Sequence, residues 1–254
     1  MGYHKAEAVV LSRREFSETS LILTFLTREA GLLRGIAKGA RRPRSLFDAG
    51  LEPFVRCALV FLDRRSQGLA LLTEATVRES FPGLRGSLDR MQAAWFAAEL
   101  LSSLCEEGNP APVLYDLLVE YLGTVAQAEG TGALVLAFAL EVLAEEGYRP
   151  QLDRCVGCGA ALGGPASRAR RLKVSARMGG TVCSGCESAG GRLVAVSPGG
   201  GAALRNLLVA PLKAVAKMRL SLTIQKECFA AVGALLAEVL GAPLRTWPLV
   251  RPHV

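Results

Sequence analysis

The sequence predicts an α+β protein with an N-terminal five-stranded β domain and a C-terminal α-helical domain, into which a four-cysteine zinc knuckle is inserted. Before residue 80 the apolar runs have the length of strands, whereas later apolar residues recur with the period of a helix. Two C-x-x-C motifs then interrupt the helical pattern. The predicted limits are residues 1–80 for the β domain and 81–254 for the helical domain, with the knuckle at about 153–196.

Five apolar runs of strand length occupy the first 80 residues. They cover residues 6–16, 19–27, 31–40, 53–62 and 68–77, and polar or glycine-containing turns separate them. Short strands at this spacing predict a small antiparallel barrel or sandwich. Gly31 and Gly35 lie beside or within the third run, where a glycine is typical of a bulge at the bend of a barrel.

Beyond Phe81-Pro82 the apolar residues follow helical spacing. The first helix is predicted at residues 87–106, with an apolar face made of Leu88, Met91, Trp95, Phe96, Ala98 and Leu101. Further helices are predicted at 112–128, at 132–146, from an N-cap at Ser197 to about Leu208, and from about Leu222 to Leu240. This part of the chain is therefore predicted to be helical.

Composition and missing motifs exclude several classes of protein. Half of the 254 residues are hydrophobic, enough for a folded core, but the longest apolar run (133–140) is far shorter than a membrane span. The N-terminus lacks the pattern of a signal peptide, so we expect a cytoplasmic protein. The histidines are His4 and His253, and no phosphate-binding loop, nucleophile elbow or dinucleotide fingerprint occurs. We expect no enzymatic activity.

The net charge of +7 is divided unevenly along the chain. Residues 1–80 carry a net charge of +4, residues 81–152 carry −7 and residues 153–254 carry +10. Basic segments on either side of an acidic one are typical of a protein that binds a polyanion. The alternative is that the partition reflects only the composition of solvated helix surfaces.

Two C-x-x-C motifs, 24 residues apart, provide four candidate metal ligands: Cys155, Cys158, Cys183 and Cys186. Four thiolates at this spacing can bind one Zn²⁺ ion tetrahedrally. Gly157 and Gly185 occupy the same position in each motif and allow tight turns. The segment between the motifs could hardly bury a core of its own, so we expect a structural zinc ion to supply the fold there. Four thiolates leave no open coordination position for catalysis.

Two other interpretations of these cysteines are a redox dithiol and structural disulfides. A redox C-x-x-C motif normally occurs once, beside a strand–helix unit, and the cytoplasm disfavours static disulfides. Structural zinc is therefore the favoured interpretation. The remaining cysteines, Cys57, Cys105 and Cys228, lie in apolar runs and are predicted to be buried thiols of the core.

One basic cluster lies in and before the stretch "IAKGARRPRS" at residues 36–45, and no acid occurs between Glu29 and Asp48. Its candidate DNA-binding residues are Arg34, Lys38, Arg41, Arg42 and Arg44. In a five-stranded barrel they fall on the third strand and the loop after it, where barrels of the oligonucleotide-binding type present a groove. Their charges would neutralise phosphates and release counterions. Phe16, Phe25, Phe47 and Phe54 could stack on bases, although each is more often a core residue.

Two further basic clusters follow. The second lies between the C-x-x-C motifs and includes Arg168, Arg170, Arg171 and Lys173. The third includes Lys213 and Lys217, which share one face if this stretch is a helix. Any one cluster can be a solvated surface, but three clusters beside a zinc knuckle and a small barrel favour binding to nucleic acid.

Several of these segments resemble one protein family in order and in content. The stretch "AVVLSRREFSETSLILTFLTREAGLLRGIAKGARRPRS", followed by "LEPF" and "LLTEATVRESFPGLR", resembles the N-terminal region of the bacterial RecO family of DNA repair proteins. The segments "EEGYRPQLDRCVGCGA", "VCSGC" and "AVSPGGGAALRNLL" resemble the rest of that family. The resemblance covers about residues 5–240 and departs at the end "GAPLRTWPLVRPHV", where family members often have a Lys/Arg-rich helix.

The resemblance implies an N-terminal OB-fold barrel and a helical C-terminal domain with an inserted zinc knuckle. It also implies a nucleoid-associated recombination mediator that binds single- and double-stranded DNA and anneals complementary strands. With RecR, such a mediator helps RecA to displace single-strand-binding protein (SSB), and it recognises the acidic, apolar-ended SSB tail. The basic stretch at residues 205–226 is the candidate rim for that tail. The alternative is a scaffold whose basic faces dock RecR and the SSB tail with little direct contact to DNA.

Overall fold

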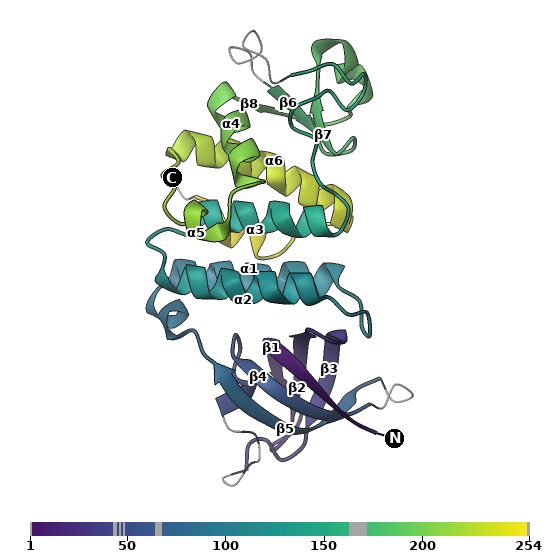
Figure 1. Ribbon diagram of the computed structural model, residues 1–254, viewed down its shortest axis with the longest axis vertical. Coiled ribbons are helices and arrows are strands. Elements are labelled where there is room, and N and C mark those ends of the chain that lie inside the picture. The colour runs from purple at the N-terminus through teal and green to yellow at the C-terminus, as the bar shows by residue number, and fades with distance from the viewer. Residues whose placement is uncertain are drawn as a thin grey trace. The chain divides into compact units, whose positions relative to one another are not determined.

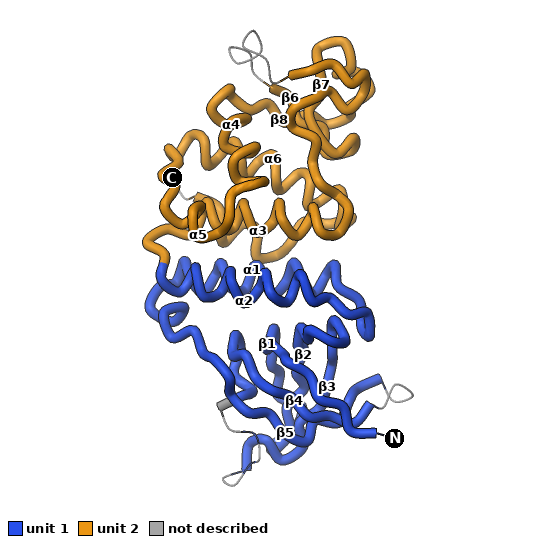
Figure 2. The backbone as a smooth tube through the Cα atoms, in the orientation of Figure 1, with its two compact units in different colours: residues 1–127 blue, residues 128–254 orange. Residues whose placement is uncertain are grey.

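The computed structural model describes residues 2–42, 45, 47, 49–63, 68–162 and 172–252. Its chain forms two compact units, residues 1–127 and 128–254 (Figure 2). A barrel and two helices make up the first unit, and helices with a three-stranded sheet make up the second (Figure 1). This division at residues 127 and 128 does not test the predicted domain limits. The limits 1–80 and 81–254, with the knuckle at about 153–196, therefore stay predictions.

The bounds of the strands and helices agree closely with the predicted segments before residue 150. The strands are β1 (Tyr3–Glu15), β2 (Leu21–Thr27), β3 (Gly31–Ala37), β4 (Arg56–Leu62), β5 (Ala70–Glu79), β6 (Leu172–Ser175), β7 (Gly180–Val182) and β8 (Leu193–Val196). The α-helices are α1 (Leu88–Leu104), α2 (Pro112–Gln127), α3 (Gly132–Glu145), α4 (Pro198–Leu207), α5 (Leu212–Val215), α6 (Leu222–Leu240) and α7 (Trp247–Val250). Short 3-10 helices are η1 (Ala49–Leu51), η3 (Pro82–Gly86) and η4 (Ser184–Ala189).

The first five strands close into a barrel in the order β1-β2-β3-β5-β4. Neighbouring strands are antiparallel except β3 and β5, which are parallel from Gly35 opposite Ala70 to Ala37 opposite Leu72. This order and this closure are those of the OB fold, a five-stranded Greek-key barrel. The barrel is therefore confirmed over the sandwich.

Gly35 allows the side chain of Leu72 to approach the β3 backbone closely, and it does not form the predicted bulge. A Cβ atom at Gly35 would lie 2.5 Å from Cδ2 of Leu72, whose side chain is buried in the barrel interior. The β2–β3 register runs from Leu21 to Thr27 without a shift, so the predicted bulges at Gly31 and Gly35 are wrong. The register shifts occur instead in the β1–β2 and β4–β5 pairings, where strands of a small barrel must bend.

Helices α1 and α2 pack against each other in the first unit, and they also contact β1 and β2, respectively. The buried residues of α1 are Ala93, Ala94, Phe96, Ala97, Ala98, Leu100 and Leu101. Leu88 and Trp95 of the predicted apolar face are instead exposed. The predicted face is therefore confirmed at Phe96, Ala98 and Leu101 and wrong at Leu88 and Trp95.

In the second unit, α3 is apolar on almost every side and its residues from Leu134 to Leu140 are all buried. Helix α6 packs against α3, α4 and β8. The predicted N-cap of α4 is confirmed, because Oγ of Ser197 accepts a hydrogen bond from the Gly200 N–H (3.1 Å). Within the described residues, no helix is both long and apolar enough to cross a membrane.

A three-stranded antiparallel sheet in the order β7-β6-β8 was not predicted. Its buried apolar residues are Leu172, Val174, Val182 and Val196. The expectation that the segment between the motifs could hardly bury a core is therefore wrong for residues 172–182, because β6 pairs with β8 and β8 packs against α6. That a metal ion supports the fold there stays a prediction. Residues 163–171 lie outside the described part of the chain.

Candidate metal centre and nucleic-acid interface

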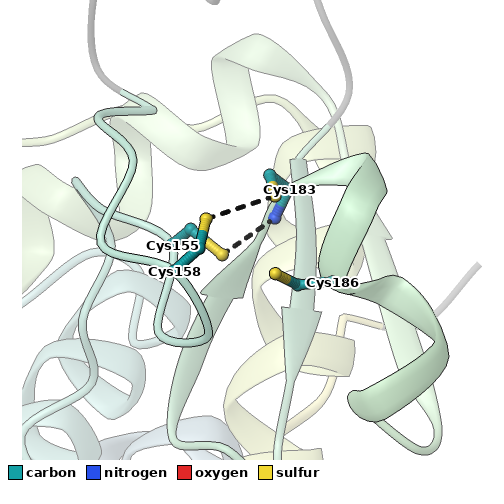
Figure 3. Close-up of side chains that lie close together, drawn as sticks. All are labelled: Cys155, Cys158, Cys183 and Cys186. Atoms are coloured by element: carbon teal, nitrogen blue, oxygen red, sulfur yellow. Dashed lines mark hydrogen bonds between the residues drawn. The ribbon is translucent and has the colours of Figure 1, made fainter.

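The four predicted ligand cysteines converge on one point of the second unit (Figure 3). All four Sγ atoms lie within 4.8 Å of one another, and Sγ of Cys158 is 3.6 Å from Sγ of Cys183. In a tetrahedral zinc site with Zn–S bonds of about 2.3 Å, neighbouring sulfurs are about 3.8 Å apart. The spacing and the donor set therefore fit a single ion bound by four thiolates.

Backbone hydrogen bonds to β7 bring the two C-x-x-C motifs together. The Val156 N–H donates to the carbonyl oxygen of Thr181 (2.9 Å), and the Thr181 N–H donates to that of Gln151 (2.8 Å). The buried Thr181 hydroxyl lies 3.1 Å from the carbonyl oxygen of Arg154. Since Cys183 directly follows β7, these bonds place the second motif beside the first.

Contacts within the cluster shift the pKa values of Cys155 and Cys186 in opposite directions. The Cys183 N–H donates to Sγ of Cys155 (3.3 Å), and this bond is the main cause that lowers the pKa of Cys155 to about 6. Contacts with the neighbouring thiols, that of Cys183 first, raise the pKa of Cys186 to about 12. One thiolate is thus stabilised by the protein itself, whereas four together require a cation among them.

The cysteines outside the cluster have different surroundings. Cys57 and Cys228 are fully buried, and burial raises the pKa of each thiol to about 12, as expected for core residues. Cys105 lies at the C-terminal end of α1 and is only half-buried, so its assignment to the core was wrong. Cys105 is the C-cap residue of α1, where the chain leaves the packed helix and solvent can reach the side chain.

The barrel carries cations on the outer face of β1 and β3 and in the turn after β3. Strand register aligns Arg14, Ile22 and Ile36 in one row and Ser12, Thr24 and Arg34 in the next. These positions alternate with Leu21, Leu23 and Ala37, which are buried in the barrel. Lys38, Arg41 and Arg42 follow β3 in the next turn and are exposed. We call Arg14, Arg34, Lys38, Arg41 and Arg42 the basic barrel face.

Two cations of the basic barrel face already have carboxylate partners. Nε of Arg34 lies 3.1 Å from Glu107, and a guanidinium nitrogen of Arg41 lies 3.2 Å from Glu15. These exposed pairs contribute little stability and can be exchanged for a phosphate at small cost. Lys38 and Arg42 have no carboxylate within salt-bridge distance among the described residues. The predicted Arg44 lies outside the described residues.

A backbone hydrogen bond joins the turn after β3 to the turn between β1 and β2. The Arg41 N–H donates to the carbonyl oxygen of Thr19 (3.2 Å), and the Arg42 N–H donates to that of Gly39 (3.0 Å). Arg14 was not among the predicted site residues, because its orientation depends on which of Arg13 and Arg14 faces outward. The barrel settles this, since Arg13 forms an ion pair with Glu52.

Of the four phenylalanines considered for base stacking, Phe25, Phe47 and Phe54 are buried. Phe16 differs, because its side chain is 62% exposed in the turn between β1 and β2. It is therefore the member of that group that can contact a ligand without unfolding the barrel.

The structure describes the second and third basic clusters only in part. Lys173 lies in β6 and forms an ion pair with Glu187, whereas Arg168, Arg170 and Arg171 lie outside the described residues. Lys213 and Lys217 are exposed, but α5 ends at Val215. The condition for a shared helix face is therefore not met, because the helix that holds Lys213 is too short to include Lys217.

The fold and the two sites define a protein that has an OB-fold barrel with a basic outer face and a helical unit with a cluster of four cysteines that could hold a metal ion. Family models for the N-terminal part of recombination protein O and for its C-terminal part match residues 1–81 and 85–248, respectively. The chain is 35% identical to the DNA repair protein RecO of Anaeromyxobacter dehalogenans over 241 residues. The matched region covers 94% of this chain and 92% of that protein. It is 33% identical over 253 residues to the RecO protein of Desulfitobacterium hafniense, covering 98% and 89%, respectively.

This chain belongs to the RecO family of DNA repair and recombination proteins, as the resemblance in its sequence predicted. Members of this family are not enzymes, in agreement with the expectation drawn from the sequence motifs.

Proposed function

We propose that this chain is a recombination mediator that binds single- and double-stranded DNA through the basic barrel face and anneals complementary strands. With RecR, it helps to load RecA on strands coated with SSB. The observation that carries the proposal is the closed OB barrel whose outer rows hold Arg14 and Arg34, continued by Lys38, Arg41 and Arg42. Family membership supports DNA and RecR as partners.

The chemistry of the basic barrel face suits a backbone contact without base-specific hydrogen bonding. Cations on β1 and β3 and in the turn after β3 can neutralise phosphates of a nucleic-acid strand laid across them. Each contact releases a condensed counterion, so the affinity should fall steeply with salt. Half-buried Ile22 and Ile36 separate the cations and offer no hydrogen-bonding group to a base edge.

We propose that Cys155, Cys158, Cys183 and Cys186 hold a structural Zn²⁺ ion. Soft thiolate ligands in a four-sulfur set favour zinc, and a closed set leaves no position for a reacting water molecule. The ion would fix the two motifs to β7 and so support the local fold. Elemental analysis of the purified chain should find one zinc per chain; none, or another metal, would contradict the assignment.

A pair of double variants tests the basic barrel face. Lys38→Ala with Arg42→Ala removes two cations that lack a partner among the described residues, and the salt slope of DNA binding should fall by about 2. The matched pair Lys213→Ala with Lys217→Ala removes the same charge from the second unit and should change the slope less. An unchanged salt slope in the Lys38→Ala, Arg42→Ala variant would contradict the assignment of the basic barrel face to DNA binding.

The alternative function is a scaffold that docks acidic segments of RecR or of the SSB tail with little direct DNA contact. One observation favours it: Arg34 and Arg41 already bind carboxylates of this chain. Titration of bare oligonucleotide at two salt concentrations separates the two functions. A scaffold would show weak binding to DNA at both concentrations and salt-dependent binding to an acidic peptide.

A further inference from the structure

The turn between β1 and β2 presents an aromatic ring to solvent beside the basic barrel face. Phe16 is 62% exposed, although the burial of a phenylalanine side chain is favourable. Single exposed apolar residues are common on proteins, so exposure alone does not indicate a site. The surroundings of Phe16 provide the further observations.

The backbone that carries Phe16 is held rigidly. The N–H groups of Phe16 and Ser17 both donate to the carbonyl oxygen of Ser20, at 3.0 and 3.3 Å. The Ser20 N–H donates in return to Oγ of Ser17 (3.2 Å). A closed turn of this kind fixes where the ring is presented, so binding a ligand costs little ordering of the chain.

Cations flank this ring in the sequence and in space. Arg14 lies on the outer face of β1 two residues earlier, and the backbone of Arg41 is hydrogen-bonded to Thr19 of the same turn. Of the two acids near the ring, Glu15 is already paired with Arg41 and Glu18 is exposed. An exposed aromatic side chain on a turn that follows one arginine of the strand and is hydrogen-bonded to the backbone of another can take a nucleobase close to cations for the neighbouring phosphates.

We propose that Phe16 stacks on an unpaired nucleobase and gives the basic barrel face its preference for single strands over duplex. The proposal rests on the DNA-binding function proposed above. A base within a duplex is covered on both faces by its neighbours, so Phe16 could reach it only after unstacking. A base in a single strand has a free face, while phosphates are present in both ligands. The ring therefore discriminates the two, and the cations do not.

The test compares three ligands of equal length: oligo(dT), the same backbone without bases, and a duplex. Phe16→Ala should bind oligo(dT) about tenfold more weakly than the wild type, because one stacked base is lost. Its affinity for the abasic strand and for the duplex should change less than about twofold, and its salt slope should stay the same because no charge is removed.

Two further variants control this comparison. Phe16→Trp should keep the preference, and the fluorescence of the new indole should be quenched by oligo(dT) and not by the abasic strand. Glu18→Gln changes the charge of the same turn and should affect the three ligands equally. Because Phe16 is exposed, the melting temperature of each variant should match that of the wild type.

The outcomes separate the two proposals. Equal losses of Phe16→Ala on all three ligands, or no loss on any, would overturn the stacking role and leave the DNA-binding function standing. A wild-type chain that bound none of the three ligands would overturn the DNA-binding function, and the role of Phe16 with it.

Discussion

The backbone of Gly157 passes close to a sulfur of the opposite C-x-x-C motif. A Cβ atom there would lie 2.9 Å from Sγ and 3.0 Å from Cβ of Cys186. Gly185 holds the same position in the second motif, yet the nearest atom to a Cβ there would be Sγ of Cys183 at 3.9 Å. Two glycines that look equivalent in the sequence therefore differ in what the metal centre requires of them.

These distances give a matched pair of variants. Gly157→Ala should push Cys186 out of position and speed the release of the zinc ion that we propose for this site by about tenfold, the lower end of the effect of disturbing a ligand's surroundings. Gly185→Ala should release zinc at nearly the wild-type rate. Transfer of the metal to a coloured chelator measures both rates, and equal rates for the two variants would contradict the geometry.

Asp116 and Arg28 join α2 to the end of β2. Two hydrogen bonds from the Arg28 guanidinium reach the carboxylate, at 2.8 and 3.2 Å, and they hold the pKa of Asp116 below its ordinary value. A carboxyl group whose pKa is lowered in the folded state stabilises that state above its unfolded pKa and loses the effect as the pH falls. Both side chains are half-exposed, so the effect is small.

Asp116→Asn should therefore lower the melting temperature slightly at pH 7. The difference from the wild type should shrink as the pH falls below about 4, where the carboxylate becomes protonated. Glu120→Gln, an exposed position on the same helix, serves as the control. A difference for Asp116→Asn that stays constant from pH 7 to pH 3 would show that charge is not its cause.

At the scale of elements, two glycines have opposite consequences. In β3, a side chain at Gly35 would overlap Leu72, so Gly35→Ala should destabilise the barrel by about 1–3 kcal/mol. In α2, a Cβ atom at Gly123 would make an ordinary contact of 3.7 Å with Phe81, so Gly123→Ala should stabilise the helix by up to about 1 kcal/mol. Chemical denaturation gives both values, and shifts of the same sign would refute this account.

The sequence predicted well those elements that are long enough for the spacing of their apolar residues to distinguish a strand from a helix. The barrel strands and α2, α3 and α6 are of this kind. Strands β6 to β8 contain three or four residues each, too few to show an alternation, and they exist because β8 packs against α6. The apolar face of α1 depends on how closely other helices approach, which a ranking of side chains by hydrophobicity does not contain.

The two candidate sites also differ in how far the sequence alone could predict them. The ligand cysteines could be predicted from their spacing, since each motif already brings two sulfurs together. The basic barrel face could be predicted only in part, because register across β1, β2 and β3 decides that Arg14 and Arg34 lie on the same side. Exposure of Phe16 and burial of Phe25 likewise follow from the closed barrel.

At the scale of the whole molecule, the chain forms two compact units, and the four clustered cysteines all lie in the second. Removal of the metal with a chelator should therefore act on one unit alone. Amide exchange should become faster in β6, β7 and residues 151–156, which depend on the cysteine motifs, and should stay slow in β1 to β5. Mass spectrometry of peptides from both units measures this, and faster exchange throughout the barrel would show that the units do not behave separately.

During synthesis, the barrel can close only late. Strands β1, β2 and β3 are neighbours in the sequence and can pair as they emerge, but β3 must wait for β5, which begins at Ala70. Until then the far edge of β3 is an unpaired template for strands of other chains. Lys38, Arg41 and Arg42 directly follow that edge, and positive charge beside an open edge opposes aggregation. The cations that we propose for DNA would thus also protect the nascent chain.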